Sequence, residues 1–140
     1  MKLLKALLLL LGLATILVFA YLLWRGDAEM GRRIVENNCG VCHDLTLTRK
    51  NIKGPYLWGL VGRPAGSAEG FAYSDAFLSM AREKSLVWTP ENIDKFMTHP
   101  DSFIPNSKMT EKKKTHIISF DGIDSEANRR DLIAFLKTLK

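Results

Sequence analysis

The only two cysteines of the chain lie three positions apart, and a histidine follows the second one directly, as Cys39-Gly-Val-Cys42-His43. Three kinds of site use two cysteines at this spacing: a redox disulfide, half of a zinc site, or a haem attachment point. A redox disulfide calls for a thioredoxin-like βαβ frame, and a zinc site calls for a second pair of ligands at similar spacing, which the sequence does not contain. The adjacent histidine favours covalent haem attachment over these two and over a chance cluster at a helix end.

The spacing of the two cysteines suits the chemistry of a c-type haem. Each thiol adds to one vinyl group, and two intervening residues let one helical turn present both sulfurs to one edge of the macrocycle. The imidazole of His43 then lies under the ring as the proximal iron ligand. The sequence therefore predicts one haem c held by Cys39, Cys42 and His43.

A run of 19 uncharged and mostly apolar residues extends from Ala6 to Trp24. As a helix it is about 28 Å long, close to the thickness of a hydrocarbon core. Lys2 and Lys5 precede it, so the positive-inside rule places the N-terminus in the cytoplasm and the rest of the chain outside. We expect residues 1–25 to be an uncleaved anchor in a bacterial inner membrane, and residues 26–140 to be a periplasmic haem domain.

A cleaved signal peptide is the alternative to this anchor. Val18-Phe19-Ala20 offers residues that a signal peptidase accepts, and the apolar region of a signal peptide spans about 7–15 residues. This run is longer, and bulky residues follow the candidate cleavage point as Tyr21-Leu22-Leu23-Trp24. These two features favour an uncleaved anchor.

The formal charge of +5 overstates the basic character of the haem domain. Without Lys2, Lys5 and Arg25, 17 basic residues remain against 15 acidic ones, so the domain is near +2. No concentrated basic stripe is present, which argues against nucleic-acid binding. No nucleophile–base pair stands out either, so we expect neither an enzyme nor a small-molecule substrate.

Beyond residue 25 the chain has the pattern of a small helical domain with long loops. Asp27 suits the N-cap of a first helix, and Thr89-Pro90 places a cap and a proline at the start of a later one. Residues 44–72 are rich in glycine and contain two prolines, which predicts an irregular loop. Loops of this length make sense when they wrap a prosthetic group. We predict an all-α domain with helices over residues 28–41, 75–83, 90–99 and 125–139.

The residue on the far side of the iron determines the function of such a site. An open position allows gas or substrate chemistry, whereas a filled one favours electron transfer. Met109 lies in a proline-containing loop far downstream of the haem motif, where it can cross the opposite face of the haem, although an ordinary loop methionine remains the alternative. The candidate ligands are Met30, Met80, Met97, Met109, His99 and His116.

Five segments in order resemble class I cytochromes c of the mitochondrial and α-proteobacterial type, over nearly all of residues 29–140. His99 stands where the family has asparagine, and the chain has an insertion after Met109. The segments are the haem motif at 39–43, the G-P-x-L-x-G-x-x-G-R-like stretch at 54–63, the G-F-x-Y-S-x-A stretch at 70–76, the P-x-x-F-I-P-x-S-K-M stretch at 100–109, and the terminal helix at 130–136.

This resemblance implies roles for several further residues. Met109 would be the distal iron ligand, and the carbonyl of Pro55 would accept a hydrogen bond from the ring of His43. Gly31 would let the first and last helices cross closely, against Leu132 and Phe135. Three side chains would surround a haem propionate: Arg63, Tyr73 and Trp88.

The resemblance also implies a function, which is to carry single electrons. We expect the bc1 complex as donor and a terminal cytochrome oxidase as acceptor. Alternatives are a dedicated electron-entry subunit of one dehydrogenase or reductase, a haem sensor or enzyme with a labile sixth ligand, and a haem-free CxxC redox protein. The insertion after Met109 predicts a positive rim for an acidic partner or simply a solvated charge run, and its histidine is a competing ligand; the residues concerned are Lys108, Lys112, Lys113, Lys114 and His116.

Overall fold

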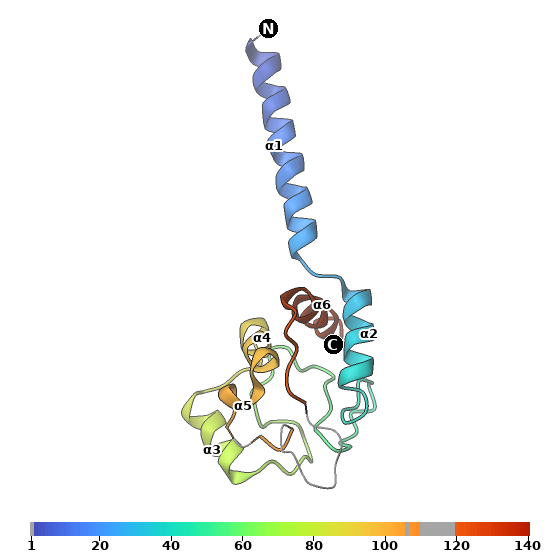
Figure 1. The fold of residues 1–140 in the computed structure, drawn as a ribbon, viewed down its shortest axis with the longest axis vertical. Coiled ribbons are helices and arrows are strands. Elements are labelled where there is room, and N and C mark those ends of the chain that lie inside the picture. The colour runs from blue at the N-terminus through green and yellow to red at the C-terminus, as the bar shows by residue number, and fades with distance from the viewer. Residues whose placement is uncertain (1, 106, 110–119) are drawn as a thin grey trace.

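The protein is described by a computed structural model that covers residues 2–105, 107–109 and 120–140. Within these residues every regular element is a helix, and one isolated antiparallel bridge joins Pro64 to Val87. The chain therefore has the all-α architecture with long loops that its pattern predicts (Figure 1). The helices are α1 (Lys2–Trp24), α2 (Ala28–Asn38), α3 (Asp75–Glu83), α4 (Pro90–Thr98), α5 (Pro100–Phe103) and α6 (Glu126–Leu136).

Four of the helices begin where a side chain caps them. A side-chain oxygen accepts from backbone amides of the first turn in each case, which satisfies donors that have no partner inside the helix. The capping residues are Asp27 before α2, Ser74 before α3, Thr89 before α4 and Ser125 before α6. These residues fix the order and start of the elements from local sequence alone.

The helices differ from the predicted ones at two ends and by one additional helix. α2 ends at Asn38 rather than at residue 41, because the chain turns sharply at Cys39. α6 ends at Leu136 rather than at residue 139. Pro100 ends α4 as predicted but also starts the short helix α5, which the sequence analysis missed, because proline suits the first position of a new helix.

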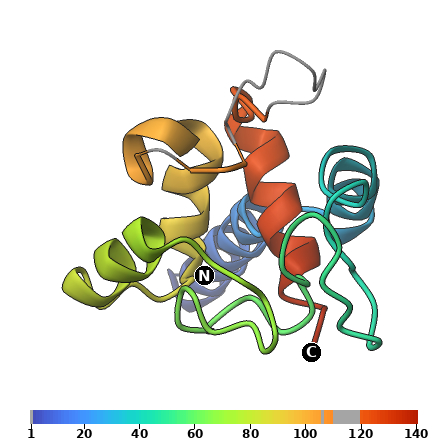
Figure 2. The same ribbon diagram turned by 90° about the horizontal axis from the view of Figure 1, so that it is seen from below.

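The core of the domain forms where α6 crosses between α2 and α4, as Figure 2 shows. A Cβ atom on Gly31 would overlap the carbonyl oxygen of Asp131 and lie 2.9 Å from Cβ of Phe135, so the close crossing requires glycine. Val35 and Leu132 are fully buried at this crossing. Removing such side chains from water is the main source of stability for a small domain.

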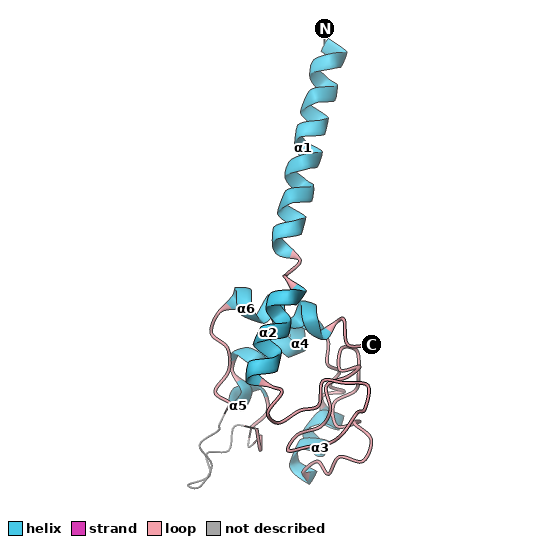
Figure 3. Ribbon diagram, turned by 90° about the vertical axis from the view of Figure 1, so that its right-hand side faces the viewer, coloured by secondary structure: helices cyan, strands magenta, loops and turns pink. Residues whose placement is uncertain are grey.

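α1 differs from every other helix because its apolar side chains are exposed throughout residues 2–22. Leu3 is 89% exposed and Phe19 is 65% exposed, and the helix extends away from the rest of the molecule (Figures 1 and 3). The stretch Lys2–Leu22 is long and apolar enough to cross a membrane, a property that signal sequences share.

Candidate haem-binding site

The two cysteines lie in a tight turn at the C-terminal end of α2. The amide of Cys39 donates to Val35 O (2.8 Å), and the amides of Cys42 and His43 both donate to Cys39 O (3.0 and 2.9 Å). Both thiols are free, with Cys39 buried and Cys42 half-buried. The turn therefore brings two unpaired thiols and an imidazole to the same end of one helix.

The surroundings of Cys39 argue against a redox-active dithiol. Burial, together with the neighbouring Cys42, raises the pKa of the Cys39 thiol to about 12. Reactive CxxC pairs instead have a thiol whose pKa is lowered. A zinc site also lacks support, because residues 2–105, 107–109 and 120–140 contain no group of three or more metal-ligating side chains.

The imidazole of His43 is held by the chain that returns past it at residues 54–55. Its Nδ1 lies 2.6 Å from Pro55 O, and the amide of Gly54 donates to Cys42 O (2.8 Å). Burial lowers the pKa of His43, so the ring is neutral at physiological pH. With Nδ1–H donated to Pro55, the lone pair of Nε2 is available to a metal.

Gly54 leaves the space that the imidazole occupies. A Cβ atom at this position would lie 2.7 Å from Nδ1 and 2.8 Å from Nε2 of His43, and would overlap Cε1. Because these distances are shorter than van der Waals contact, no residue with a Cβ atom fits at position 54 while the ring of His43 keeps its place. The absence of a side chain at Gly54 therefore gives the ring its space, and Pro55 orients the ring by hydrogen bonding.

The carboxylate of Asp44 organises the loop that carries Gly54 and Pro55. It accepts four hydrogen bonds: from the amide (2.9 Å) and hydroxyl (2.8 Å) of Thr46, the hydroxyl of Thr48 (2.6 Å) and the amide of Lys50 (2.8 Å). The bonds from Thr48 and Lys50 lead in holding the pKa of Asp44 well below its usual range. The buried charge is thus fully satisfied, and it shapes residues 44–50.

Arg63 is a half-buried cation that follows the segment carrying Gly54 and Pro55. The guanidinium of Arg63 donates to Tyr56 O (2.7 Å) and Trp58 O (3.1 Å), and it lies 4.7 Å from the ring centre of Tyr56. Burial lowers the pKa of Arg63, and the nearby Tyr73 opposes this effect. Within the described residues Arg63 has no ion pair with a carboxylate.

Tyr73 and Trp88 lie beside Arg63. The hydroxyl of Tyr73 accepts from the amide of Ala68 (3.4 Å), and burial raises the pKa of this phenol. The amide of Trp88 donates to Arg63 O, and Trp88 O accepts from Gly62, both at 2.9 Å. The structure therefore places Tyr73 within electrostatic reach of Arg63, and it joins Trp88 to the Arg63 segment through the backbone.

Met109 is half-buried and packs against the core cluster that also contains Cys39. Its amide donates to the hydroxyl of Ser107 (3.3 Å), and its carbonyl accepts from Phe120 (3.3 Å). Among the other candidates, Met97 is buried in α4 and Met30 is 47% exposed on α2. Lys108 is exposed, whereas Lys112, Lys113, Lys114 and His116 lie outside the described residues.

Comparison with known proteins supports the interpretation of this geometry. The chain is 36% identical over 115 residues to a cytochrome c of Euglena viridis, which covers 82% of this chain and 99% of that protein. It is 33% identical over 115 residues to cytochrome c2 of Rhodopila globiformis, covering 82% and 95% respectively. The chain belongs to the cytochrome c family.

A further bacterial protein is also similar to this chain. The protein named cytochrome c-type cyt cy of Rhodobacter capsulatus is 35% identical over 114 residues, which is 81% of this chain and 50% of that protein. No protein-family model matches the chain. The assignment therefore rests on individual relatives together with the architecture of the domain.

As a member of this family, the cytochrome binds one covalently attached haem c and transfers electrons between redox partners, and it is not an enzyme. The donor set fits this group, since it offers two unpaired thiols and a neutral imidazole whose Nε2 is free of the Pro55 bond. Arg63, a half-buried cation with no carboxylate partner among the described residues, also fits a cofactor that carries carboxylates.

Two parts of the site were missed by the sequence analysis. Gly54 was noted only as part of a family segment, although its position directly before Pro55 was a usable signal. Asp44, which is followed by Leu-Thr-Leu-Thr, was given no role. Only the folded loop shows that Thr46, Thr48 and Lys50 converge on the carboxylate.

Proposed function

We propose that this cytochrome is a membrane-anchored, monohaem electron carrier on the periplasmic face of a bacterial inner membrane. The proposal divides the chain into an anchor, residues 1–25, and a haem domain, residues 26–140. It is carried by the apolar surface of residues 2–22 of α1, none of which is buried against the described part of the domain. A lipid bilayer is the environment that suits such a surface.

In the proposed site, the thiols of Cys39 and Cys42 form the two thioether links, and His43 binds the iron. The bound haem supplies a one-electron iron couple. The carbonyl oxygen of Pro55 accepts a hydrogen bond from Nδ1–H of His43 and so fixes both the tautomer and the angle of the ring. Because Gly54 has no side chain, the ring has the space to lie in the position that the Pro55 bond orients.

Met109 completes the proposed ligand set from the other side. A thioether paired with an imidazole favours ferrous iron and raises the potential. It also blocks the position that an external ligand would need, which suits a carrier rather than a sensor. The half-buried position of Met109 against the core supports this role over that of a solvent-exposed loop residue.

Arg63, Tyr73 and Trp88 are proposed to hold a haem propionate. Arg63 is partly desolvated and has no carboxylate partner among the described residues, which is costly unless an anion is supplied. Tyr73 lies within electrostatic reach of Arg63, and Trp88 is joined to it by the backbone. A propionate would neutralise the cation and accept from both neighbours.

The proposed route runs from the bc1 complex to a terminal cytochrome oxidase. Relatives named cytochrome c and cytochrome c2 support a general carrier over a subunit dedicated to one enzyme. Membrane vesicles that contain the purified cytochrome, the bc1 complex and quinol test the first half of the route. Rapid haem reduction that is blocked by a bc1 inhibitor is expected; reduction at the rate seen without the complex would contradict it.

The anchor is tested by comparing the full chain with a version in which residues 1–25 are replaced by a cleavable secretion signal. The full chain should remain in the membrane pellet after a carbonate wash, while the shortened one should be soluble and carry haem. If the protein expressed from the full sequence has a mature N-terminus at Tyr21, directly after Ala20, this would contradict an uncleaved anchor.

A further inference from the structure

The joint between α1 and α2 is very short. The amide of Arg25 donates to Tyr21 O (3.0 Å), which continues the hydrogen bonding of α1. Asp27 is already the N-cap of α2, and its carbonyl accepts from the amide of Gly31 (2.9 Å). Arg25 is the last residue bonded to α1 and Asp27 the first residue bonded to α2, so only Gly26 lies between the two sets of helical hydrogen bonds. A one-residue joint lacks the freedom of a flexible linker.

Gly26 is pressed against α6. Its φ is +77°, in the left-handed region that favours glycine. A Cβ atom here would lie 2.7 Å from the carbonyl oxygen of Arg130 and 3.1 Å from Cβ of Ala134. The joint therefore packs on the C-terminal helix of the haem domain.

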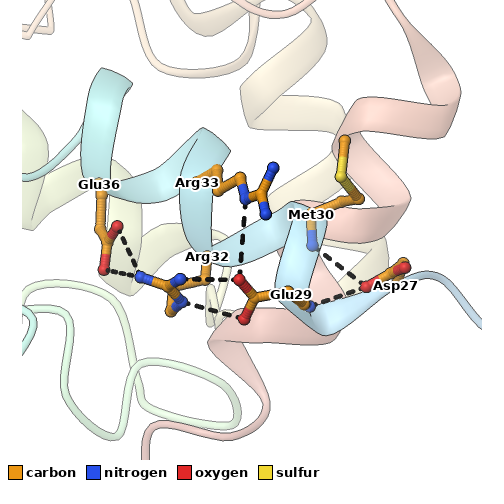
Figure 4. A network of polar contacts seen from close by, with 6 residues as sticks. All are labelled: Asp27, Glu29, Met30, Arg32, Arg33 and Glu36. Carbon is orange, nitrogen blue, oxygen red and sulfur yellow. Dashed lines mark hydrogen bonds and ion pairs between the residues drawn. The ribbon is translucent and has the colours of Figure 1, made fainter.

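Asp27, directly after the joint, is bonded to both α2 and α6. Its carboxylate accepts from the amides of Glu29 (2.8 Å) and Met30 (3.1 Å), as Figure 4 shows. Its own amide donates to Oδ1 of Asp131 (2.8 Å), which lies 104 positions away on α6. The start of α2 and the first residue after the joint are thus tied to α6 by a hydrogen bond as well as by packing.

The haem domain has two distinct ends relative to α1. In Figures 1 and 3, α2 and α6 lie at the end that α1 joins, whereas α3, α5 and the segment that leads to Met109 lie at the opposite end. A domain of this size has a radius of gyration of about 13 Å and is therefore roughly 35 Å across. That is the scale of the separation between the membrane end and the Met109 end.

We propose that Gly26, Asp27 and Asp131 hold the anchor and the haem domain in one fixed orientation, which presents the Met109 end away from the bilayer. This inference rests on the proposed function, in which α1 spans a membrane. The partner that fits such a surface is a redox protein whose docking face stands roughly 35 Å above the lipid headgroups. A partner whose docking face is level with the headgroups does not fit.

Distance measurements between two spin labels test the fixed orientation, in full-length holoprotein reconstituted in nanodiscs. The labels are placed at Ile16→Cys on α1 and at Glu83→Cys on α3, both exposed. Cys39 and Cys42 are consumed by haem attachment, so only the introduced thiols react. A six-residue Gly-Ser insertion between Arg25 and Gly26 gives the distribution of a flexible joint.

The unmodified joint should give a single distance distribution at most half as wide as that of the insertion variant. Asp131→Ala should broaden it, while Asn128→Ala, an exposed change on the same helix, should leave it unaltered. An unmodified joint as broad as the insertion, or no broadening in Asp131→Ala, would overturn the proposal. Haem spectra of all variants confirm that each domain is folded.

A second measurement tests which end faces the membrane. A fluorophore at Met30→Cys, near the joint, should be quenched several-fold more by headgroup spin-labelled lipids than one at Glu83→Cys. Equal or reversed quenching would overturn the orientation. A haem-loaded protein that fails to enter nanodiscs contradicts the proposed anchor itself, whereas a nanodisc-bound protein with a broad distribution contradicts only the fixed orientation.

Discussion

The two sides of the proposed haem site are built in different ways. On the His43 side, the key contacts join residues close in sequence: His43 to Pro55, Cys42 to Gly54, and Asp44 to Lys50. On the Met109 side, Met109 itself bonds to Ser107 and Phe120, but the segment around Ile123 is fastened to distant elements. Short-range contacts shape a loop on their own, so the first side depends little on the rest of the fold, and the second depends on how the helices pack.

A buried arginine shows how the Met109 side is fastened. Arg129 of α6 donates to Asp94 on α4 (2.7 Å) and to the carbonyls of Ile123 and Asp124 (2.8 Å each). Ile123 also donates its amide to Met97 O (2.7 Å). The segment that follows the Met109 loop is therefore held between two helices rather than by its own sequence.

The largest expected effect is the loss of haem on removing the first ligand. His43→Ala should abolish nearly all stable c-type haem, because the ring that orients the cofactor is absent. Haem-stained gels and absorbance per mole of protein measure this, with Lys108→Ala as an exposed control. Normal haem content in His43→Ala would show that stable haem attachment does not require His43.

The opposite ligand should matter for reactivity rather than for attachment. Met109→Leu keeps the size and apolarity of the side chain, so we expect haem content close to that of the parent protein. Ferrous haem should then bind carbon monoxide readily, and the midpoint potential should fall. Loss of haem in this variant would erase the contrast between the two sides.

The space beside the imidazole offers a smaller test. Gly54→Ala forces a methyl group against His43 and should lower the free energy of unfolding by about 2–3 kcal/mol and shift the haem spectrum. Gly59→Ala is a matched control, because Gly59 has φ +66° but open space around it. It should cost about 1 kcal/mol with an unchanged spectrum. Equal spectra in both variants would contradict steric positioning by Gly54.

Arg129→Met should weaken the other side. It leaves the carbonyls of Ile123 and Asp124 without their donor, and we expect a loss of about 2 kcal/mol in denaturant unfolding. The ligation of Met109 should also become more labile, seen as faster binding of an external ligand. Arg32→Met is the control, because the ion pairs of Arg32 with Glu29 and Glu36 are exposed (Figure 4). It should change the free energy of unfolding little.

The smallest expected effect concerns Asp44. Because its pKa is depressed in the folded state, its contribution is present above the unfolded value of about 3.9 and is lost as the pH falls below that value. Asp44→Asn should therefore lower the melting temperature at pH 7, and the difference from the parent should shrink between about pH 4 and pH 2. A difference that stays constant with pH would contradict the role of the charge.

The difference between the two sides also explains what the sequence could predict. The haem motif, the caps at Asp27 and Thr89 and the loop over residues 44–72 are local patterns, and the fold follows them. The pairing of Arg129 with Asp94 spans 35 positions and has no local signal. Met109 could be singled out from six candidates only through resemblance to a family, because its packing depends on the whole fold.

The central claim is a haem c held between His43 and Met109 in an electron carrier. The most direct test is the optical spectrum of the detergent-solubilised protein, oxidised, reduced, and reduced with carbon monoxide. A sharp c-type reduced band, a weak far-red band in the oxidised state and no response to carbon monoxide are the predicted result. Haem without the far-red band, together with carbon monoxide binding, would remove Met109 from the ligand set and contradict this account.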